Sequence, residues 1–260
     1  MAGLGEQHLR LRALRNANVE GRLEWNRDID RNRRRRDRPR ARGHASPRCG
    51  TLVAMRRIGH RGAKGHAPDN TMESFEKALA LGCDEIETDV WLTDDGRLLV
   101  SHDRPKPDLK LTLEDVLDFC RGKMGVNVEL KCEMSEKGAH QTGAQVGKVL
   151  AERRDPDAYV SSFWWAALEG SKIAGPSVRR AFLFSCSPDR SALMESARDM
   201  RLWALHPNRA FVTPEFVHAA HAAGLKANAW TVNEPSEIAL FAEWGIDGIM
   251  SDYPERVPKG

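Results

Sequence analysis

Alternation between short apolar runs and helical stretches, beginning near residue 56, constrains this chain more than any other feature. Strands are indicated by β-branched and apolar runs of five to seven residues, and helices by amphipathic stretches, several of which begin at Thr or Ser residues. The expected strands are 56–60, 85–91, 97–102, 126–131, 158–162, 179–184, 202–206, 225–231 and 247–251. The expected helices cover about 71–81, 112–121, 139–153, 164–174, 188–199, 213–223 and 234–243.

One of the nine strands does not fit a regular alternation. Segments 85–91 and 97–102 are separated by Leu92-Thr-Asp-Asp-Gly96, and Asp-Gly is a hairpin turn signal too short for a parallel crossover. We therefore expect 97–102 to be an antiparallel flap after the second strand. Eight strands and seven helices then remain, which predicts an α/β fold of the (β/α)₈ TIM-barrel class. An open doubly wound sheet is the alternative, but neither a GxGxxG nor a Walker pattern supports it.

The N-terminal segment differs in composition from the rest. Residues 1–50 contain 14 Arg, no Lys and six acidic residues, a net charge of +8, whereas residues 51–260 have a net charge of −5. Such a polar, Arg-rich segment cannot form a core. We expect residues 1–54 to be a basic, disordered extension and residues 55–260 to be the barrel domain. The extension is either dispensable or an arm that binds anionic polymers such as nucleic acid.

Ionisable residues gather where the expected strands end, which is the functional face of such a barrel. Glu87 and Asp89 lie two apart on one strand and so share a face, and the phase of the next strand turns Glu129 and Lys131 inward. Three carboxylates about 5 Å apart would repel each other by roughly 3 kcal/mol per pair at an effective dielectric of about 20. Protonation or a divalent cation would relieve this, and oxygen ligands suit Mg²⁺ or Ca²⁺. The alternative is a solvated strand end neutralised by Lys131.

Two histidines and two cations flank these carboxylates. His60 and His102 end strands beside them, and histidine exchanges protons near neutral pH. Arg61 and Lys131 supply positive charge for an anion. A divalent metal cation together with these two histidines, Arg61 and Lys131 favours phosphoryl transfer over peptide or carbohydrate hydrolysis.

The segment RIGHRGAKGHAPDNTMESFEKALALGCDEIETDVWLTDDGRLLVSHD closely resembles the signature of glycerophosphodiester phosphodiesterases, and NVELK, AWTVN and GIDGIMSDYP fit it further along. The resemblance spans nearly all of 56–256. It implies a TIM-barrel hydrolase, related in mechanism to phosphatidylinositol-specific phospholipase C, that cleaves glycerophosphodiesters to glycerol phosphate and an alcohol through a cyclic phosphate.

The resemblance also implies roles for individual residues. Glu87, Asp89 and Glu129 would hold Mg²⁺ or Ca²⁺, His60 and His102 would be the acid–base pair, and Arg61, Lys131 and Trp230 would contact the substrate. The motif PDNT would cap the helix that follows, and Asp252 would support the site.

The chain departs from the family pattern in two places. Asp69 stands where the family usually has Glu, and only RPKPDLK follows the His-Asp pair where many relatives have a long insertion. The shorter segment implies a more open site. A phospholipase D-like activity on lysophospholipids or sphingomyelin-type lipids is therefore the alternative hypothesis for the enzymatic activity. A non-catalytic barrel that binds anionic polymers through its Arg-rich tail is the alternative from another class.

Cysteine content and hydropathy bear on the compartment. The five cysteines (49, 83, 120, 132 and 186) form no CxxC pair, which favours reduced thiols in a cytoplasmic protein. Neither a secretory signal nor an apolar run of membrane-spanning length is present. We expect a small-molecule or lysolipid phosphodiester as the ligand and no specific nucleic-acid partner.

Overall fold

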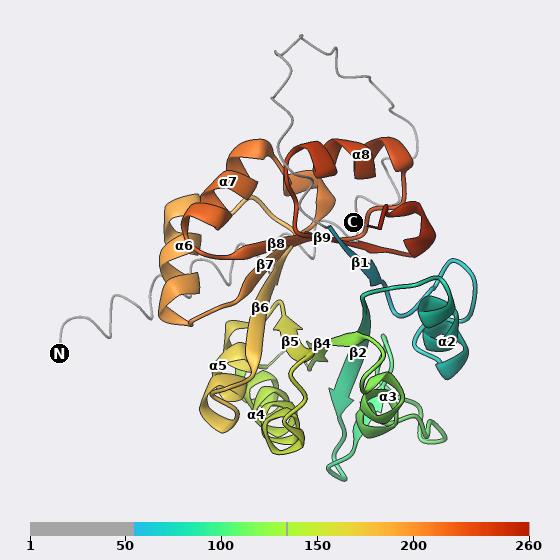
Figure 1. The fold of residues 1–260 in the computed structure, drawn as a ribbon. Coiled ribbons are helices and arrows are strands. Elements are labelled where there is room, and N and C mark those ends of the chain that lie inside the picture. The colour runs from blue at the N-terminus through green and yellow to red at the C-terminus, as the bar shows by residue number, and fades with distance from the viewer. Residues whose placement is uncertain (1–54, 134, 260) are drawn as a thin grey trace, which may run out of the picture.

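Eight parallel strands form a closed barrel in the computed structural model, which describes residues 55–133 and 135–259 (Figure 1). The strand order runs β1-β9-β8-β7-β6-β5-β4-β2, and β1 closes the barrel by pairing with β2 as well as β9. The strands are β1 (Arg56–Gly59), β2 (Glu85–Leu92), β4 (Gly125–Lys131), β5 (Ala158–Ser162), β6 (Arg179–Phe184), β7 (Ala204–Pro207), β8 (Lys226–Ala229) and β9 (Gly248–Ser251). The predicted barrel is confirmed.

The remaining strand, β3 (Leu98–Val100), lies outside the barrel. It pairs antiparallel with the end of β2, with Val90 opposite Val100 and Leu92 opposite Leu98. Gly96 adopts a φ of 83° in the connecting turn, a conformation that glycine tolerates without strain. The predicted hairpin flap is therefore present.

Seven α-helices surround the strands within the described part of the chain (Figure 1). They are α2 (Met72–Ala80), α3 (Leu113–Cys120), α4 (Glu136–Arg153), α5 (Trp165–Ala174), α6 (Arg190–Asp199), α7 (Pro214–Ala222) and α8 (Pro235–Glu243), with short 3₁₀ turns η2 (Arg209–Phe211) and η3 (Pro254–Arg256). Thr71, Thr112 and Thr213 cap α2, α3 and α7 through their side chains. Helix α4 begins earlier than expected because Ser135 accepts a cap hydrogen bond from Gly138 N.

The strands separate an apolar layer from a polar one. On β2, Ile86 and Val90 belong to the buried core between strands and helices, and Val126 and Val128 do the same on β4. The alternate side chains of both strands point into the barrel, where many are polar. Strand alternation therefore places the acids of β2 and β4 on the barrel's inner face.

The cysteines of the described residues form no disulfide. Burial raises the pKa of the Cys83 and Cys120 thiols to about 12. The redox state of the thiols stays a prediction, and Cys49 lies outside the described residues.

The Arg-rich segment 1–54, including the predicted anionic-polymer arm, lies outside the residues that the structure describes. Within the described ranges, none of the helices combines the length and the apolarity that crossing a membrane requires.

Candidate active site

Three carboxylates meet at the C-terminal ends of β2 and β4. Asp89 and Glu129 are register partners on the paired strands, and Glu87 lies one inward position earlier on β2. Oxygen atoms of Glu87, Asp89 and Glu129 all lie within 4.8 Å of one another. Glu87 and Asp89 are buried, and the Glu129 side chain is 12 % exposed. The structure therefore brings together the three acids that the sequence placed on one face.

Two cations contact this group. Lys131 Nζ lies 2.5 Å from Glu129 Oε1 and 2.9 Å from Asp89 Oδ1, and Arg61 Nε lies 3.1 Å from Asp89 Oδ2. Burial opposes ionisation of Asp89, but Lys131 and Arg61 outweigh it and lower the pKa of the Asp89 carboxyl. Burial also opposes the charge on Lys131, yet Glu129 and Asp89 raise its pKa. The cations thus keep part of the cluster ionised.

The neighbouring cations do not fully compensate a negative charge on Glu87. Burial, followed by the charges of Asp89 and Glu129, raises the pKa of the Glu87 carboxyl well above its usual range. Its Oε2 accepts a hydrogen bond from Arg61 N at 3.0 Å, but its buried Oε1 has no hydrogen-bond partner in the described structure. A buried, unpaired carboxylate oxygen beside two other acids is the donor arrangement that a divalent cation satisfies.

The loop after β1 presents His60 and Arg61 beside these acids. Arg61 has a φ of 50°, a sparsely populated conformation of the kind that functional sites retain. Gly62 follows with a φ of 85°, and a Cβ there would lie 2.2 Å from Ser74 Oγ of α2. The tight packing of this loop against α2 therefore requires the glycine of the His-Arg-Gly motif.

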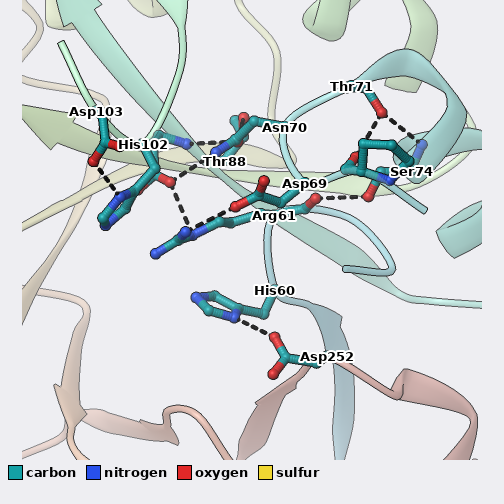
Figure 2. Close-up of polar contacts among 12 residues, drawn as sticks. His60, Arg61, Asp69, Asn70, Thr71, Ser74, Thr88, His102, Asp103 and Asp252 are labelled. Carbon is teal, nitrogen blue, oxygen red and sulfur yellow. Dashed lines mark hydrogen bonds and ion pairs between the residues drawn. The ribbon is translucent and has the colours of Figure 1, made fainter. Parts of the chain in front are cut away.

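Asn70 was not singled out from the sequence, yet it fixes Asp89. Its Nδ2 donates to Asp89 Oδ2 at 2.8 Å, and its Oδ1 accepts from Asp89 N at 3.2 Å. The same Oδ1 accepts from Thr88 Oγ1 at 2.9 Å (Figure 2). Its φ of 56° suits asparagine, which tolerates left-handed backbone. The signal was its place in PDNT, just before the Thr71 cap.

Asp69, the departure from the family pattern, lies outside the carboxylate group. Its Oδ2 accepts from Arg61 Nη1 at 2.8 Å (Figure 2). Because the Arg61 guanidinium contacts both Asp69 and Asp89, these two acids hold it at the edge of the site, and their charges raise its pKa although burial opposes this.

His60 is anchored by the carboxylate of Asp252, the residue that follows the last barrel strand, β9. His60 Nδ1 lies 2.6 Å from Asp252 Oδ1 (Figure 2), and Asn233 Nδ2 donates to Asp252 Oδ2 at 2.8 Å. Burial opposes ionisation of Asp252, but these contacts lower its pKa to about 2. Asp252 therefore stays ionised and leaves His60 Nε2 as the nitrogen available to a ligand.

His102 lies two residues beyond β3, in a more open position. Its Nδ1 contacts Asp103 Oδ1 at 2.9 Å, and its side chain is 42 % exposed. Burial and the charges of Lys131 and Arg61 lower the pKa of the His102 imidazole. In Figure 2, His60, Arg61 and His102 border the same space. A cavity of about 690 Å³ adjoins Arg61 and His102 and is bordered by the short segment 104–110.

Trp230, the remaining predicted site residue, follows β8. Its Nε1 donates to His206 O at 2.8 Å, and its ring contacts Phe163 edge to face at a centroid distance of 5.4 Å. The two partly exposed aromatics follow β8 and β5, and β5 pairs with β4, the strand that carries Glu129. His66, in the loop after β1, contacts Glu255 and Tyr253.

Comparison with known proteins places this geometry in context. The model of the glycerophosphoryl diester phosphodiesterase family matches residues 60–110 and 104–256. A glycerophosphodiester phosphodiesterase of Bacillus altitudinis is 32% identical over 241 residues, which cover 77% of this chain and 95% of that protein.

Two solved structures of such phosphodiesterases resemble this chain over most of its length. A putative glycerophosphoryl diester phosphodiesterase from Silicibacter pomeroyi has a TM-score of 0.71 and 28% identity, covering 80% of this chain and 93% of that one. A phosphodiesterase from Oleispira antarctica in complex with the product sn-glycerol-3-phosphate has a TM-score of 0.69 and 28% identity, covering 78% and 95%.

Proposed function

Because the chain belongs to the glycerophosphoryl diester phosphodiesterase family, we propose that it hydrolyses glycerophosphodiesters to glycerol phosphate and an alcohol. The observation that carries the proposal is the convergence of three carboxylates, two cations and an anchored histidine at one end of the barrel. The related phosphodiesterase that was solved with sn-glycerol-3-phosphate supports the same product class.

Glu87, Asp89 and Glu129 fit a divalent cation, with Mg²⁺ and Ca²⁺ as the candidates. The oxygens are spaced for a shared ligand, and Glu87 Oε1 lacks any other partner among the described residues. Bound there, the cation would neutralise the acids and stabilise negative charge on the phosphoryl oxygens.

Arg61 and Lys131 contribute positive charge on the same side. Both are held by the acids, so their charged groups are positioned before a substrate arrives. Preorganised cations of this kind stabilise a developing phosphoryl charge without further reorganisation. We assign both residues to phosphate binding.

The two histidines divide the proton transfers. His60, oriented by Asp252 through Nδ1, uses Nε2 to accept the proton of the glycerol 2-hydroxyl as that oxygen attacks phosphorus. His102, beside the cavity, donates a proton to the oxygen of the departing alcohol. The P–O bond to the alcohol breaks as the cyclic phosphate forms, and water then opens the cyclic ester to glycerol phosphate.

A phospholipase D-like reaction on lysophospholipids is the second candidate. The same atoms react there, because a lysophospholipid also presents a free 2-hydroxyl, but its glycerol carries an acyl chain. The partly exposed Phe163–Trp230 pair favours this candidate, since it offers an apolar surface to such a chain. Trp230 is assigned to the substrate on either candidate.

One experiment separates these proposals. Glycerophosphocholine and lysophosphatidylcholine are assayed side by side with Mg²⁺, with Ca²⁺ and after chelation. We expect cation-dependent release of choline, and Glu129→Gln should abolish turnover at low cation while leaving a folded barrel. Full activity of Glu129→Gln after exhaustive chelation would remove the three-carboxylate site, and hydrolysis of neither substrate would refute the function.

A further inference from the structure

The barrel interior contains a group of buried polar side chains that the proposed reaction does not use. They are Asn127 on β4, Ser161 on β5, His206 on β7 and Asn228 on β8, called here the interior polar layer. None is more than 1 % exposed. They belong to four different strands, so they are a feature of the closed barrel and not of one local motif.

Most polar atoms of this layer have no partner among the described residues. Asn228 Nδ2 lies 3.2 Å from His206 Nε2, which is the one hydrogen-bond contact found within the layer. Both polar atoms of Asn127, Ser161 Oγ, His206 Nδ1 and Asn228 Oδ1 are unpaired and inaccessible. Buried polar groups of native proteins are almost always hydrogen-bonded, to protein or to enclosed water, so these atoms have the chemistry to bind enclosed water.

Asn127 connects this layer with the carboxylates. It is the register partner of Glu87 on β2, and it precedes Glu129 by two residues on the inner face of β4. Gly125 lies two residues before Asn127 and therefore on the same face of β4. A Cβ on Gly125 would lie 3.2 Å from Glu85 Cβ inside the barrel, which supports the inward direction of the Asn127 side chain. Beside Asn127, Glu87 Oε1 is itself buried and unpaired.

We propose that an enclosed water bound by Asn127 hydrogen-bonds Glu87 Oε1 and makes Asn127 a positioning residue for the cation site. The inference rests on the proposed function, since it concerns the same three acids. Asn127 offers two donors and an acceptor, so it can orient a bridging water toward an anionic oxygen. Groups that hydrogen-bond metal-ligating carboxylates orient them and tune the affinity for the ion.

The test compares matched substitutions at two interior asparagines. Asn127→Leu replaces the carboxamide by an apolar group of similar size next to Glu87. Asn228→Leu makes the same change on β8, which is separated from β2 by β9 and β1. Mg²⁺ and Ca²⁺ affinities are measured by titration calorimetry on the full-length protein, and metal-free melting temperatures are recorded in parallel.

We expect Asn127→Leu to weaken cation affinity about 10- to 100-fold, the usual effect of losing such a hydrogen-bonding partner. Asn228→Leu should leave the affinity near that of the wild type, whatever it does to the melting temperature. If Asn127→Leu does not fold, Asn127→Ala serves in its place and should show the same direction of change. A high-resolution crystal structure should show water between Asn127 and Glu87.

The measurements distinguish failure of the proposed cation site from failure of the positioning role of Asn127. If the wild-type protein binds neither cation, the metal site of the proposed function is wrong. If it binds a cation and Asn127→Leu or Asn127→Ala binds equally well, the positioning role is wrong. Equal weakening by Asn127→Leu and Asn228→Leu would also overturn the specific link to Glu87.

Discussion

Two histidine–aspartate contacts occur at the site, and their surroundings differ. His60 contacts Asp252, whose side chain is 21 % exposed and held by Asn233, whereas His102 contacts Asp103, whose side chain is 94 % exposed. An ion pair screened by water contributes little, but a held and partly buried carboxylate fixes the ring it contacts. The two imidazoles are therefore not equivalent, although the sequence presents both simply as histidines that end strands.

Asp252→Asn tests this difference. The amide cannot stabilise an imidazolium as the carboxylate does, so we expect turnover to fall about 10²- to 10⁴-fold, the range of a positioned acid–base group. Substrate KM and cation affinity should change little, because Asp252 contacts neither the acids nor Arg61. Asp103→Asn is the matched control and should retain most activity. Equal losses from both substitutions would show that burial of the pair does not decide the role.

The division of proton transfers is tested by leaving-group pKa. An alkoxide needs a proton to depart, whereas p-nitrophenolate hardly does. His102→Ala should therefore be slowed about 10²- to 10⁴-fold on glycerophosphocholine but much less on a glycerol p-nitrophenyl phosphodiester, and His60→Ala should be slowed on both. Rescue of His60→Ala alone by the better leaving group would reverse the two roles.

At the scale of elements, the sequence predicted what short-range patterns encode. Alternation within EIETDVWL placed Glu87 and Asp89 on one face, and Asp95-Gly96 identified the flap. Contacts between distant segments were not predictable in the same way. His60 and Asp252 are 192 residues apart and meet only because β1 pairs with β9. Asn70 reaches Asp89 because its left-handed backbone turns its side chain into the site, and a single sequence does not state that conformation.

The contact between α4 and α5 depends on Gly143 and Gly170, which no sequence motif singles out. A Cβ on Gly143 would lie 1.8 Å from Ala167 O, and one on Gly170 would lie 2.1 Å from His140 O. The two helix backbones therefore approach more closely than any side chain permits.

Gly143→Ala should therefore destabilise the protein although alanine favours helices. Overpacking a fitted contact costs about 1–3 kcal/mol, which exceeds the gain in helix propensity of up to about 1 kcal/mol. Urea unfolding should show a lower midpoint. Lys148→Ala, at a 62 % exposed side chain of the same helix, is the control and should change stability by less than about 0.5 kcal/mol. An unchanged midpoint for Gly143→Ala would mean that the helices separate at no cost.

At the scale of the whole molecule, closure of the barrel surrounds polar groups that a single strand would leave in water. His206 is the clearest case, being fully buried, with Nε2 near Asn228 Nδ2. No sequence motif singles out this histidine. Burial lowers the pKa of its imidazole to about 3, so the folded protein keeps this ring neutral far into the acid range.

This burial predicts how stability depends on pH. The unfolded chain protonates His206 near the usual pKa of about 6.5, whereas the folded protein does so only near a pKa of about 3. Between these values the unfolded state binds more protons, so this stabilising contribution is complete above pH 6.5 and is lost as the pH falls toward 3. The loss is on the order of 5 kcal/mol across the window, at about 1.4 kcal/mol per pKa unit. The wild-type free energy of unfolding should decline steeply there.

His206→Gln removes the titrating group but keeps a polar side chain for Asn228. Its free energy of unfolding, measured with denaturant from pH 7 to pH 4, should have a shallower pH slope than the wild type, even if the variant is less stable at neutral pH. His218→Gln, at an exposed position of α7, is the control and should keep the wild-type slope. The pH slope of the free energy of unfolding depends on the difference in bound protons between the unfolded and folded states. A variant weakened only by poor packing would therefore have a lower free energy of unfolding at every pH but the same slope. A wild-type slope in His206→Gln would mean that His206 does not set the acid limit of this fold.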